Sequence, residues 1–236
     1  MGCRVMQVCA APPFPGELAV SCDERWRAHD LLRLRSLVAY EGEPAWVRGA
    51  FERAPYAVVR RALSAHGIVA IGVRGAGRSQ RYGTWTAATE IVDVVAPEAL
   101  LFSEPTRERA ALPAFVALAA LRGNPRSALN ALVWGPSGSA GFELATRTDA
   151  VTPSSDLDLL IRTPERLSRE CAADLLNHLQ TVALETGSRI DAQLETPAGG
   201  VALAEWAAGK ARVLARHASG PRLVADPWFS ARATVM

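Results

Sequence analysis

Two aspartates separated by a single leucine are the residues of this chain best suited to chemistry. Asp156 and Asp158 open the apolar run "DLDLLIRTP", which is typical of a β-strand that ends at a proline. In a strand, side chains two positions apart point to the same side, with Cα atoms about 6.6 Å apart. Two such carboxylates can share a divalent cation, because Mg²⁺ binds oxygen ligands at about 2.0–2.1 Å. An exposed strand can carry the same tripeptide, so the neighbouring segments decide between these interpretations.

A third carboxylate follows on the next predicted strand. The segment "RIDAQLE" places Asp191 there, although aspartate is depleted in strands. Its carboxylate can complete a metal site, or it can accept a proton from an attacking hydroxyl. We therefore predict a Mg²⁺ or Mn²⁺ site made by Asp156, Asp158 and Asp191, with an ordinary surface residue as the alternative for Asp191.

A stretch rich in glycine and serine precedes the aspartates. The sequence "GPSGSAG" contains Ser137, Gly138 and Ser139. Glycines let backbone N–H groups turn toward an anion, and the serines add hydroxyl donors. The stretch is not a P-loop, because the Gly-Lys-Ser/Thr ending is missing. We expect these three residues to contact phosphate groups, against the alternative of a simple tight turn.

A second basic and glycine-rich segment lies further upstream. The sequence "VRGAGRSQR" carries Arg74, Arg78 and Arg81 beside two glycines. Guanidinium groups bind phosphates and carboxylates through paired hydrogen bonds, so this loop suits a triphosphate, a diphosphate or an acidic protein partner. A solvated basic loop is the alternative.

Composition excludes several classes of partner. The chain has 236 residues, 49% of them hydrophobic, which is enough for one large domain or two smaller ones. Its net charge of +2 does not indicate a nucleic-acid binder. No run approaches the roughly 18 apolar residues of a membrane span. The four cysteines lack paired metal-type spacing, which fits a reducing cytoplasm.

The hydrophobic pattern predicts an α+β protein with two domains after a poorly ordered tail, residues 1–25. The first domain, residues 26–97, includes a buried strand at 67–75 that leads into the basic loop. The second domain, residues 98–236, begins with a predicted helix at 98–120. It continues with strand, helix and strand at 156–162, 164–187 and 189–200, and a further helix at 201–216.

The combined motifs resemble the nucleotidyltransferase superfamily, in which a Gly-Ser loop precedes an Asp-x-Asp strand and a later acidic strand. The longer stretches "GPSGSAGFELAT", "SDLDLLIR" and "GVRGAGRSQR" are similar to the malonate decarboxylase holo-acyl-carrier-protein synthases, also called phosphoribosyl-dephospho-CoA transferases. Two departures stand out. Residues 140–155 make a longer connection than is usual, with "RTDAVTP" as a surface excursion, and Arg147 stands where a glycine is expected.

The resemblance implies a small N-terminal α/β domain followed by a nucleotidyltransferase-like mixed sheet covered by helices. It also implies transfer of a prosthetic group from 2′-(5″-triphosphoribosyl)-3′-dephospho-CoA to a serine of the apo acyl carrier protein of malonate decarboxylase, with release of pyrophosphate. Asp156 and Asp158 would be the metal ligands, and Asp191 the third ligand or the base.

Two other functions fit the same motifs. The chain can be a nucleotidyltransferase whose acceptor is a small molecule or RNA, since the acceptor is not specified by the motif. It can also be an adaptor that binds a carrier protein without turnover. The three acidic positions argue against the adaptor, because pure binding does not need them.

Overall fold

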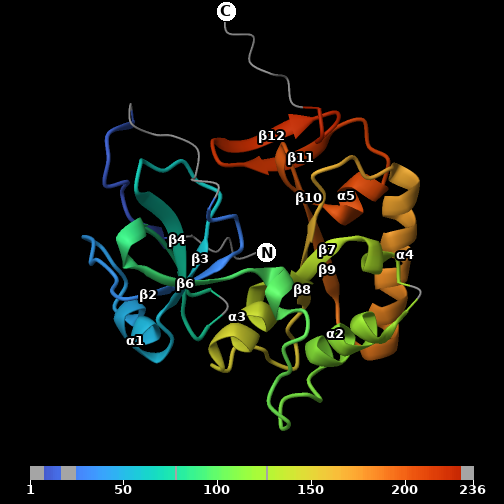
Figure 1. The fold of residues 1–236 in the computed structure, drawn as a ribbon, viewed down its shortest axis with the longest axis horizontal. Coiled ribbons are helices and arrows are strands. Elements are labelled where there is room, and N and C mark those ends of the chain that lie inside the picture. Colours follow the sequence, from blue (N-terminus) through green and yellow to red (C-terminus); the bar gives the residue numbers. More distant parts are fainter. Residues whose placement is uncertain (1–7, 17–24, 78, 126, 230–236) are drawn as a thin grey trace, which may run out of the picture. The chain divides into compact units, whose positions relative to one another are not determined.

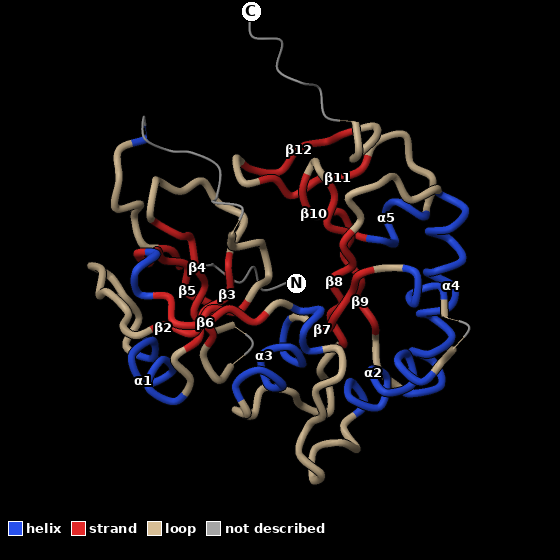
Figure 2. Tube along the Cα trace, in the orientation of Figure 1, coloured by secondary structure: helices blue, strands red, loops and turns tan. Residues whose placement is uncertain are grey.

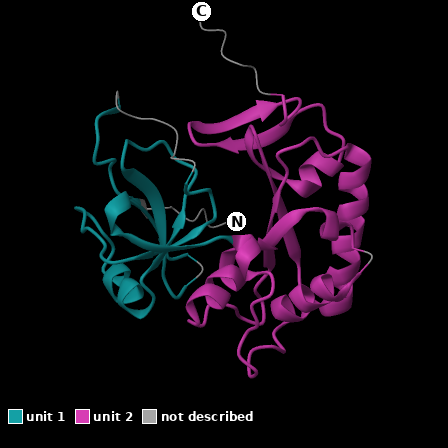
Figure 3. Cartoon of the chain, in the orientation of Figure 1, with its two compact units in different colours: residues 1–96 teal, residues 97–236 magenta. Residues whose placement is uncertain are grey.

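The chain divides into two compact units, residues 1–96 and 97–236 (Figure 3). The computed structural model describes residues 8–16, 25–77, 79–125 and 127–229. Residues 1–7 and 17–24 of the predicted N-terminal tail therefore lie outside the described residues. Each unit is built around its own six-stranded sheet (Figure 1).

In its described residues, the N-terminal unit is a sheet of order β1-β5-β4-β3-β2-β6 with one α-helix. The helix packs its buried residues Val47 and Ala50 into the core that the sheet forms. The strand predicted at 67–75 is confirmed as β4, and the basic loop joins it to its antiparallel neighbour β5. The elements are β1 (Val8–Cys9), β2 (Leu31–Leu34), α1 (Trp46–Arg53), β3 (Tyr56–Val59), β4 (Ile68–Arg74), β5 (Arg81–Ala87), the 3₁₀ turn η2 (Ala88–Glu90) and β6 (Ile91–Val95).

The C-terminal unit is a mixed sheet of order β12-β11-β10-β9-β8-β7 covered by helices. Figures 1 and 2 show α2, α4 and α5 on one side of the central strands β8 and β9, and α3 on the other. The predicted α+β class is confirmed. The elements are η3 (Pro97–Leu100), α2 (Pro113–Gly123), η4 (Ala128–Ala131), β7 (Val133–Pro136), α3 (Gly138–Thr146), β8 (Leu157–Arg162), α4 (Arg169–Thr186), β9 (Ile190–Thr196), β10 (Gly199–Ala202), α5 (Leu203–Ala207), β11 (Val213–His217) and β12 (Gly220–Val224).

The β8–α4–β9 crossover forms as the sequence predicts. Helix α4 begins after Ser168, whose hydroxyl accepts a hydrogen bond from the Cys171 N–H at 3.0 Å, and it ends at Gly187 in the left-handed conformation. A helical crossover returns the chain in the same direction, so β8 and β9 pair in parallel. No helix in the described part of the chain is long and apolar enough to cross a membrane.

The first turn of the C-terminal unit is fixed against β7. Gly135 has no side chain, and a β-carbon there would overlap the Pro97 carbonyl and lie 2.6 Å from the Glu98 nitrogen. The Glu98 carboxylate also accepts hydrogen bonds of 3.1 Å from Nε and Nη2 of Arg162, a side chain that is almost fully buried on β8. The segment Pro97–Leu100 is therefore part of this unit's packed core.

Two predicted helices are shorter than expected. In the segment 98–120, η3 is followed by turns, and α2 begins only at Pro113, whose fixed φ suits a first helical position. The segment 201–216 contains the short helix α5, which is followed by Gly209 at φ +70° before the chain continues as β11. In both segments apolar residues at helical spacing continue past residues that interrupt a helix, so the spacing alone predicts a helix that is too long.

The C-terminus of α3 gives a test of backbone strain. Arg147 caps this helix in the left-handed conformation, with φ +60°, a region that favours glycine. We predict that Arg147→Gly is more stable than Arg147→Ala by about 1 kcal/mol, because both lose the guanidinium bond to the Glu104 carbonyl and only alanine pays the left-handed cost. Urea denaturation of both variants measures the difference in the free energy of unfolding. Equal midpoints would contradict the left-handed conformation of residue 147.

Candidate active site

The glycine- and serine-rich stretch forms a turn from β7 into α3. Gly138 is the first residue of α3 and has φ +57°. A β-carbon at this position would lie 2.7 Å from Cγ of Asp158 and closer still to Oδ2. The backbone N–H of Ser137 donates a 2.8 Å hydrogen bond to the Asp158 carbonyl. The carboxylate of Asp158 therefore rests against the N-terminal turn of α3, where the helix dipole favours negative charge.

The parallel strands bring the second aspartate of the pair beside the third carboxylate. Asp158 on β8 is directly opposite Asp191 on β9, and neighbouring strands are about 4.8 Å apart. Asp156 comes immediately before β8. The structure therefore brings all three predicted carboxylates to the same end of two adjacent strands.

A residue that the motif analysis missed, Arg189, contacts two of these carboxylates. Its Nη2 donates hydrogen bonds of 2.7 Å to Asp156 Oδ2 and 2.6 Å to Asp191 Oδ2. The hydrogen bond to Asp156, followed by the negative charges of Asp191 and Asp156, raises the pKa of Arg189 above its ordinary value. The feature that could have indicated Arg189 is its position: it directly precedes β9, and in the sheet it lies beside the start of β8.

The donor set suits a hard cation by its chemistry. Carboxylate oxygens are the preferred ligands of Mg²⁺ and Mn²⁺, and two of these oxygens already converge on one positively charged nitrogen. Within the described residues, no group of three or more acidic, histidine or cysteine side chains is arranged as a complete metal site. A cation bound here would therefore need Arg189 to move aside, which its side chain, 66% exposed, has room to do.

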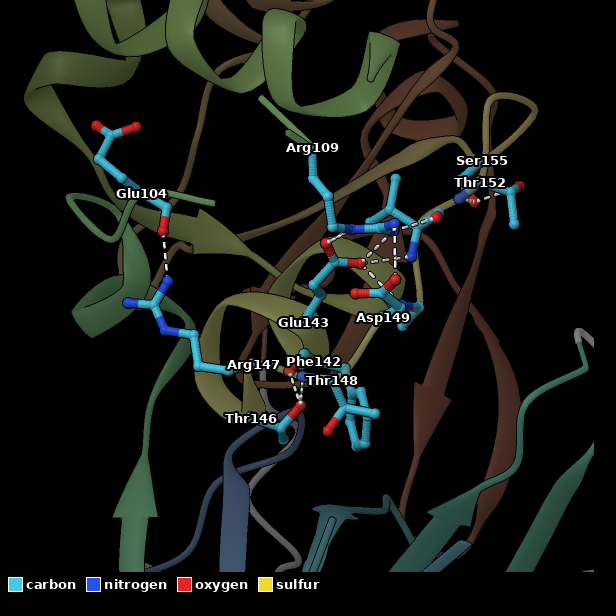
Figure 4. A network of polar contacts seen from close by, with 12 residues as sticks. Glu104, Arg109, Phe142, Glu143, Thr146, Arg147, Thr148, Asp149, Thr152 and Ser155 are labelled. Atoms are coloured by element: carbon cyan, nitrogen blue, oxygen red, sulfur yellow. Dashed lines mark hydrogen bonds and ion pairs between the residues drawn. The ribbon is translucent and has the colours of Figure 1, made fainter. Parts of the chain in front are cut away.

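An ion pair with a buried carboxylate holds the opposite end of α3 (Figure 4). Glu143 is 5% exposed and accepts hydrogen bonds from Nε and Nη2 of Arg109. Its Oε2 also accepts 2.8 Å hydrogen bonds from the backbone N–H groups of Ala150 and Val151. Arg109 completes the network through Asp149 Oδ2 at 3.0 Å and the Val151 carbonyl at 2.6 Å.

The segment "RTDAVTP" is a surface excursion, as expected, with Arg147, Asp149, Thr152 and Pro153 exposed, but the network anchors it. The connection is anchored at Glu143, and Val151 and Ser155 are both buried. The Ser155 hydroxyl accepts a 2.9 Å hydrogen bond from the Thr152 N–H. Because this connection leads directly into Asp156, the network positions the aspartate pair relative to α3.

The basic loop belongs to the N-terminal unit, where it connects the antiparallel strands β4 and β5. Arg74 and Arg81 are opposite each other at the ends of β4 and β5. Nη1 of Arg81 donates to the loop carbonyls of Gly77 and Gln80 at 3.3 and 3.0 Å. Arg78 lies outside the described residues. Arg81 therefore has a structural role in this turn, beside the phosphate role that the sequence predicts for all three.

Comparisons with known proteins agree over most of the chain. Residues 27–97 match the family model for the phosphoribosyl-dephospho-CoA transferase MdcG N-terminal domain, and residues 101–227 match the model for its C-terminal domain. A protein of Pseudomonas aeruginosa named phosphoribosyl-dephospho-CoA transferase is 48% identical over 85% of this chain and 92% of its own length. A protein of the same name from Pseudomonas putida is 44% identical over 85% of this chain and 94% of its own. A search of solved structures found no significant match.

The close contact at Gly138 can be tested by adding one methyl group. We predict that Gly138→Ala lowers the free energy of unfolding by at least about 1 kcal/mol, because the left-handed backbone disfavours alanine and the new methyl group displaces the Asp158 carboxylate. The control is Gly123→Ala at the end of α2, where a β-carbon meets nothing within 4 Å. Urea denaturation measures both, and equal midpoints would rule out the contact.

The buried ion pair predicts a pH dependence of stability. Burial alone would raise the pKa of Glu143, but the Arg109 guanidinium and the two backbone N–H groups outweigh burial and lower the pKa below its ordinary 4.5. The ionised Glu143 carboxylate therefore contributes its full stabilisation of the folded state above about pH 4.5. This stabilisation is lost as the pH falls through the lower pKa that Glu143 has in the folded state. We predict that Glu143→Gln removes this part of the pH dependence and destabilises the protein by about 3 kcal/mol at pH 7.

The exposed partner of the same arginine provides the control. Asp149 is 74% exposed, so we expect Asp149→Asn to cost less than about 1 kcal/mol at pH 7. Urea midpoints of the three proteins between pH 3 and pH 7 separate the two contributions. A Glu143→Gln variant that keeps the wild-type pH profile would show that this carboxylate is not the titrating group.

Proposed function

The chain belongs to the phosphoribosyl-dephospho-CoA transferase family and is a transferase, and from this premise we propose the reaction that it catalyses. The donor is 2′-(5″-triphosphoribosyl)-3′-dephospho-CoA. The acceptor is a serine of the apo acyl carrier protein of malonate decarboxylase, and pyrophosphate is released. The observation that carries this proposal is the in-register pair Asp158–Asp191 against the N-terminal turn of α3.

Each part of the site has a role in this proposal. The serine hydroxyl attacks the α-phosphorus in line with the departing pyrophosphate, so catalysis depends mainly on positioning and charge neutralisation. Ser137, Gly138 and Ser139 present the start of α3 to the phosphate groups. Asp191 either completes the metal site or accepts the proton of the attacking hydroxyl.

Asp156 and Asp158 are the proposed ligands of Mg²⁺ or Mn²⁺. The cation, when bound, would neutralise the charge that develops on the leaving pyrophosphate. In the described structure the two side chains come from the residue before β8 and the second residue of β8, and the Glu143 network fixes the connection that precedes them.

The basic hairpin is the proposed contact for the acidic groups of the substrates. Arg74, Arg78 and Arg81 would bind the donor's phosphates or acidic side chains of the carrier protein, as paired hydrogen bonds from guanidinium groups allow. We also propose a cytoplasmic location, where cysteines such as Cys9 and Cys171, free in this structure, stay reduced.

The proposal is tested by weighing the carrier protein after reaction. Purified enzyme, apo carrier protein, Mg²⁺ and the triphosphoribosyl donor should together give a carrier heavier by one phosphoribosyl-dephospho-CoA group. We predict that Asp156→Asn and Asp158→Asn each lower the rate by at least about 100-fold, because they remove transition-state charge stabilisation, while both remain folded.

The control substitution is Asp174→Asn, a carboxylate on α4 outside the three-aspartate cluster, which we expect to retain wild-type activity. Full activity in either site variant would reject the metal-ligand assignment. No mass gain with a donor that another enzyme of the family uses would favour a different acceptor, a small molecule or RNA. Carrier binding without any transfer would favour the adaptor.

A further inference from the structure

The side chain of Arg189 takes up the position where two aspartates converge. One nitrogen, Nη2, contacts Oδ2 of Asp156 at 2.7 Å and Oδ2 of Asp191 at 2.6 Å. The arrangement follows from the parallel pairing, since the Arg189 carbonyl accepts a 2.8 Å hydrogen bond from the N–H of Leu157, the residue after Asp156. A positive charge is thus built into the cluster by the strand register.

The charges of the cluster explain why such a residue is needed. Three carboxylates at one end of two adjacent strands repel each other when no cation lies between them. Arg189 offsets this repulsion, and its raised pKa, caused first by the hydrogen bond to Asp156 and then by the charges of Asp191 and Asp156, is the reciprocal effect. Arg189 therefore stabilises the cluster of carboxylates when no cation lies between them.

The same contacts are weak enough to be exchanged. The Arg189 side chain is 66% exposed, that of Asp191 is 51% exposed and that of Asp156 is 21% exposed. The mobile partner of both ion pairs is therefore the exposed arginine, and ion pairs with an exposed partner are individually modest in energy. A divalent cation binds oxygens at about 2.0–2.1 Å. If the cation took the place of Nη2, the carboxylate oxygens of Asp156 and Asp191 would each need to move only about 0.6 Å closer to that point.

We propose that Arg189 is an internal counter-ion, which holds Asp156 and Asp191 together and which a divalent cation must displace in order to bind. Arg189 therefore lowers the affinity of the site for the cation, and it is a positioning residue rather than a ligand. This inference rests on the proposed function, because it takes Asp156 as a metal ligand and, of the two roles given for Asp191, the one that completes the metal site.

The first experiment measures Mn²⁺ affinity, with free Mn²⁺ followed by electron paramagnetic resonance. We expect Arg189→Gln to bind Mn²⁺ about three- to tenfold more tightly than the wild type, because the competing charge is gone. Arg189→Lys should stay close to wild type, since it keeps the charge. The matched control is Arg166→Gln, which makes the same change in net charge in a pair with Asp226, beyond the opposite end of β8, and should leave the affinity unchanged.

The second experiment separates this role from an ordinary structural ion pair. We expect Arg189→Gln to unfold at lower urea than the wild type in EDTA, and at equal or higher urea in saturating Mn²⁺, because the cation then replaces the lost guanidinium. An ion pair that only supports the fold would give the same deficit under both conditions, and that result would overturn the inference.

The outcomes also distinguish this inference from the proposed function. If the wild type binds Mn²⁺, Asp158→Asn abolishes binding, and Arg189→Gln binds no more tightly, the metal site stands and only the counter-ion role is overturned. If neither the wild type nor Arg189→Gln binds Mn²⁺ at millimolar concentration, the metal assignment and the counter-ion role fail together.

Discussion

The candidate site depends on the in-register parallel pairing of β8 with β9. Parallel strands need a crossover, and α4 provides it between Ser168 and Gly187, the residues that set its start and its end. A slip by one residue would move every side chain of β9 to the opposite face of the sheet. Asp158 would then lose Asp191 as its neighbour, and Arg189 would no longer be level with the start of β8.

Two groups of charges serve the site in different ways. The Glu143 carboxylate is buried beside Arg109 and accepts several hydrogen bonds, so the geometry of this pair is fixed once the chain folds. In the group around Arg189 the arginine itself is exposed, and we propose that its contacts are exchanged with those of a cation. A rigid support beside an adjustable cluster is what positional catalysis of the proposed phosphoryl transfer requires, since one part must stay in place while charges rearrange in the other.

The strands and the helix that position the aspartates could be predicted because their signals are local. Alternating residues around Asp158, a serine before α4 and a glycine after it are all visible in short windows of sequence. Arg109 and Glu143 are 34 residues apart in sequence, and no periodicity indicates that such residues pair. The prediction of a helix over 98–120 was wrong because of the same long-range contact. The residues before Pro113 form turns, and these turns place the Arg109 side chain where it reaches Glu143 on α3.

The contact between Pro97 and Gly135 decides where this protein can be divided. The match to the C-terminal family model begins at residue 101, yet η3 at residues 97–100 covers β7 at a point where no side chain exists, and it carries Glu98 to Arg162. A fragment that started at residue 101 would leave the backbone of Gly135 bare and the guanidinium of a nearly buried arginine without its carboxylate. The natural cut therefore falls at Ala96, the single residue between β6 and η3.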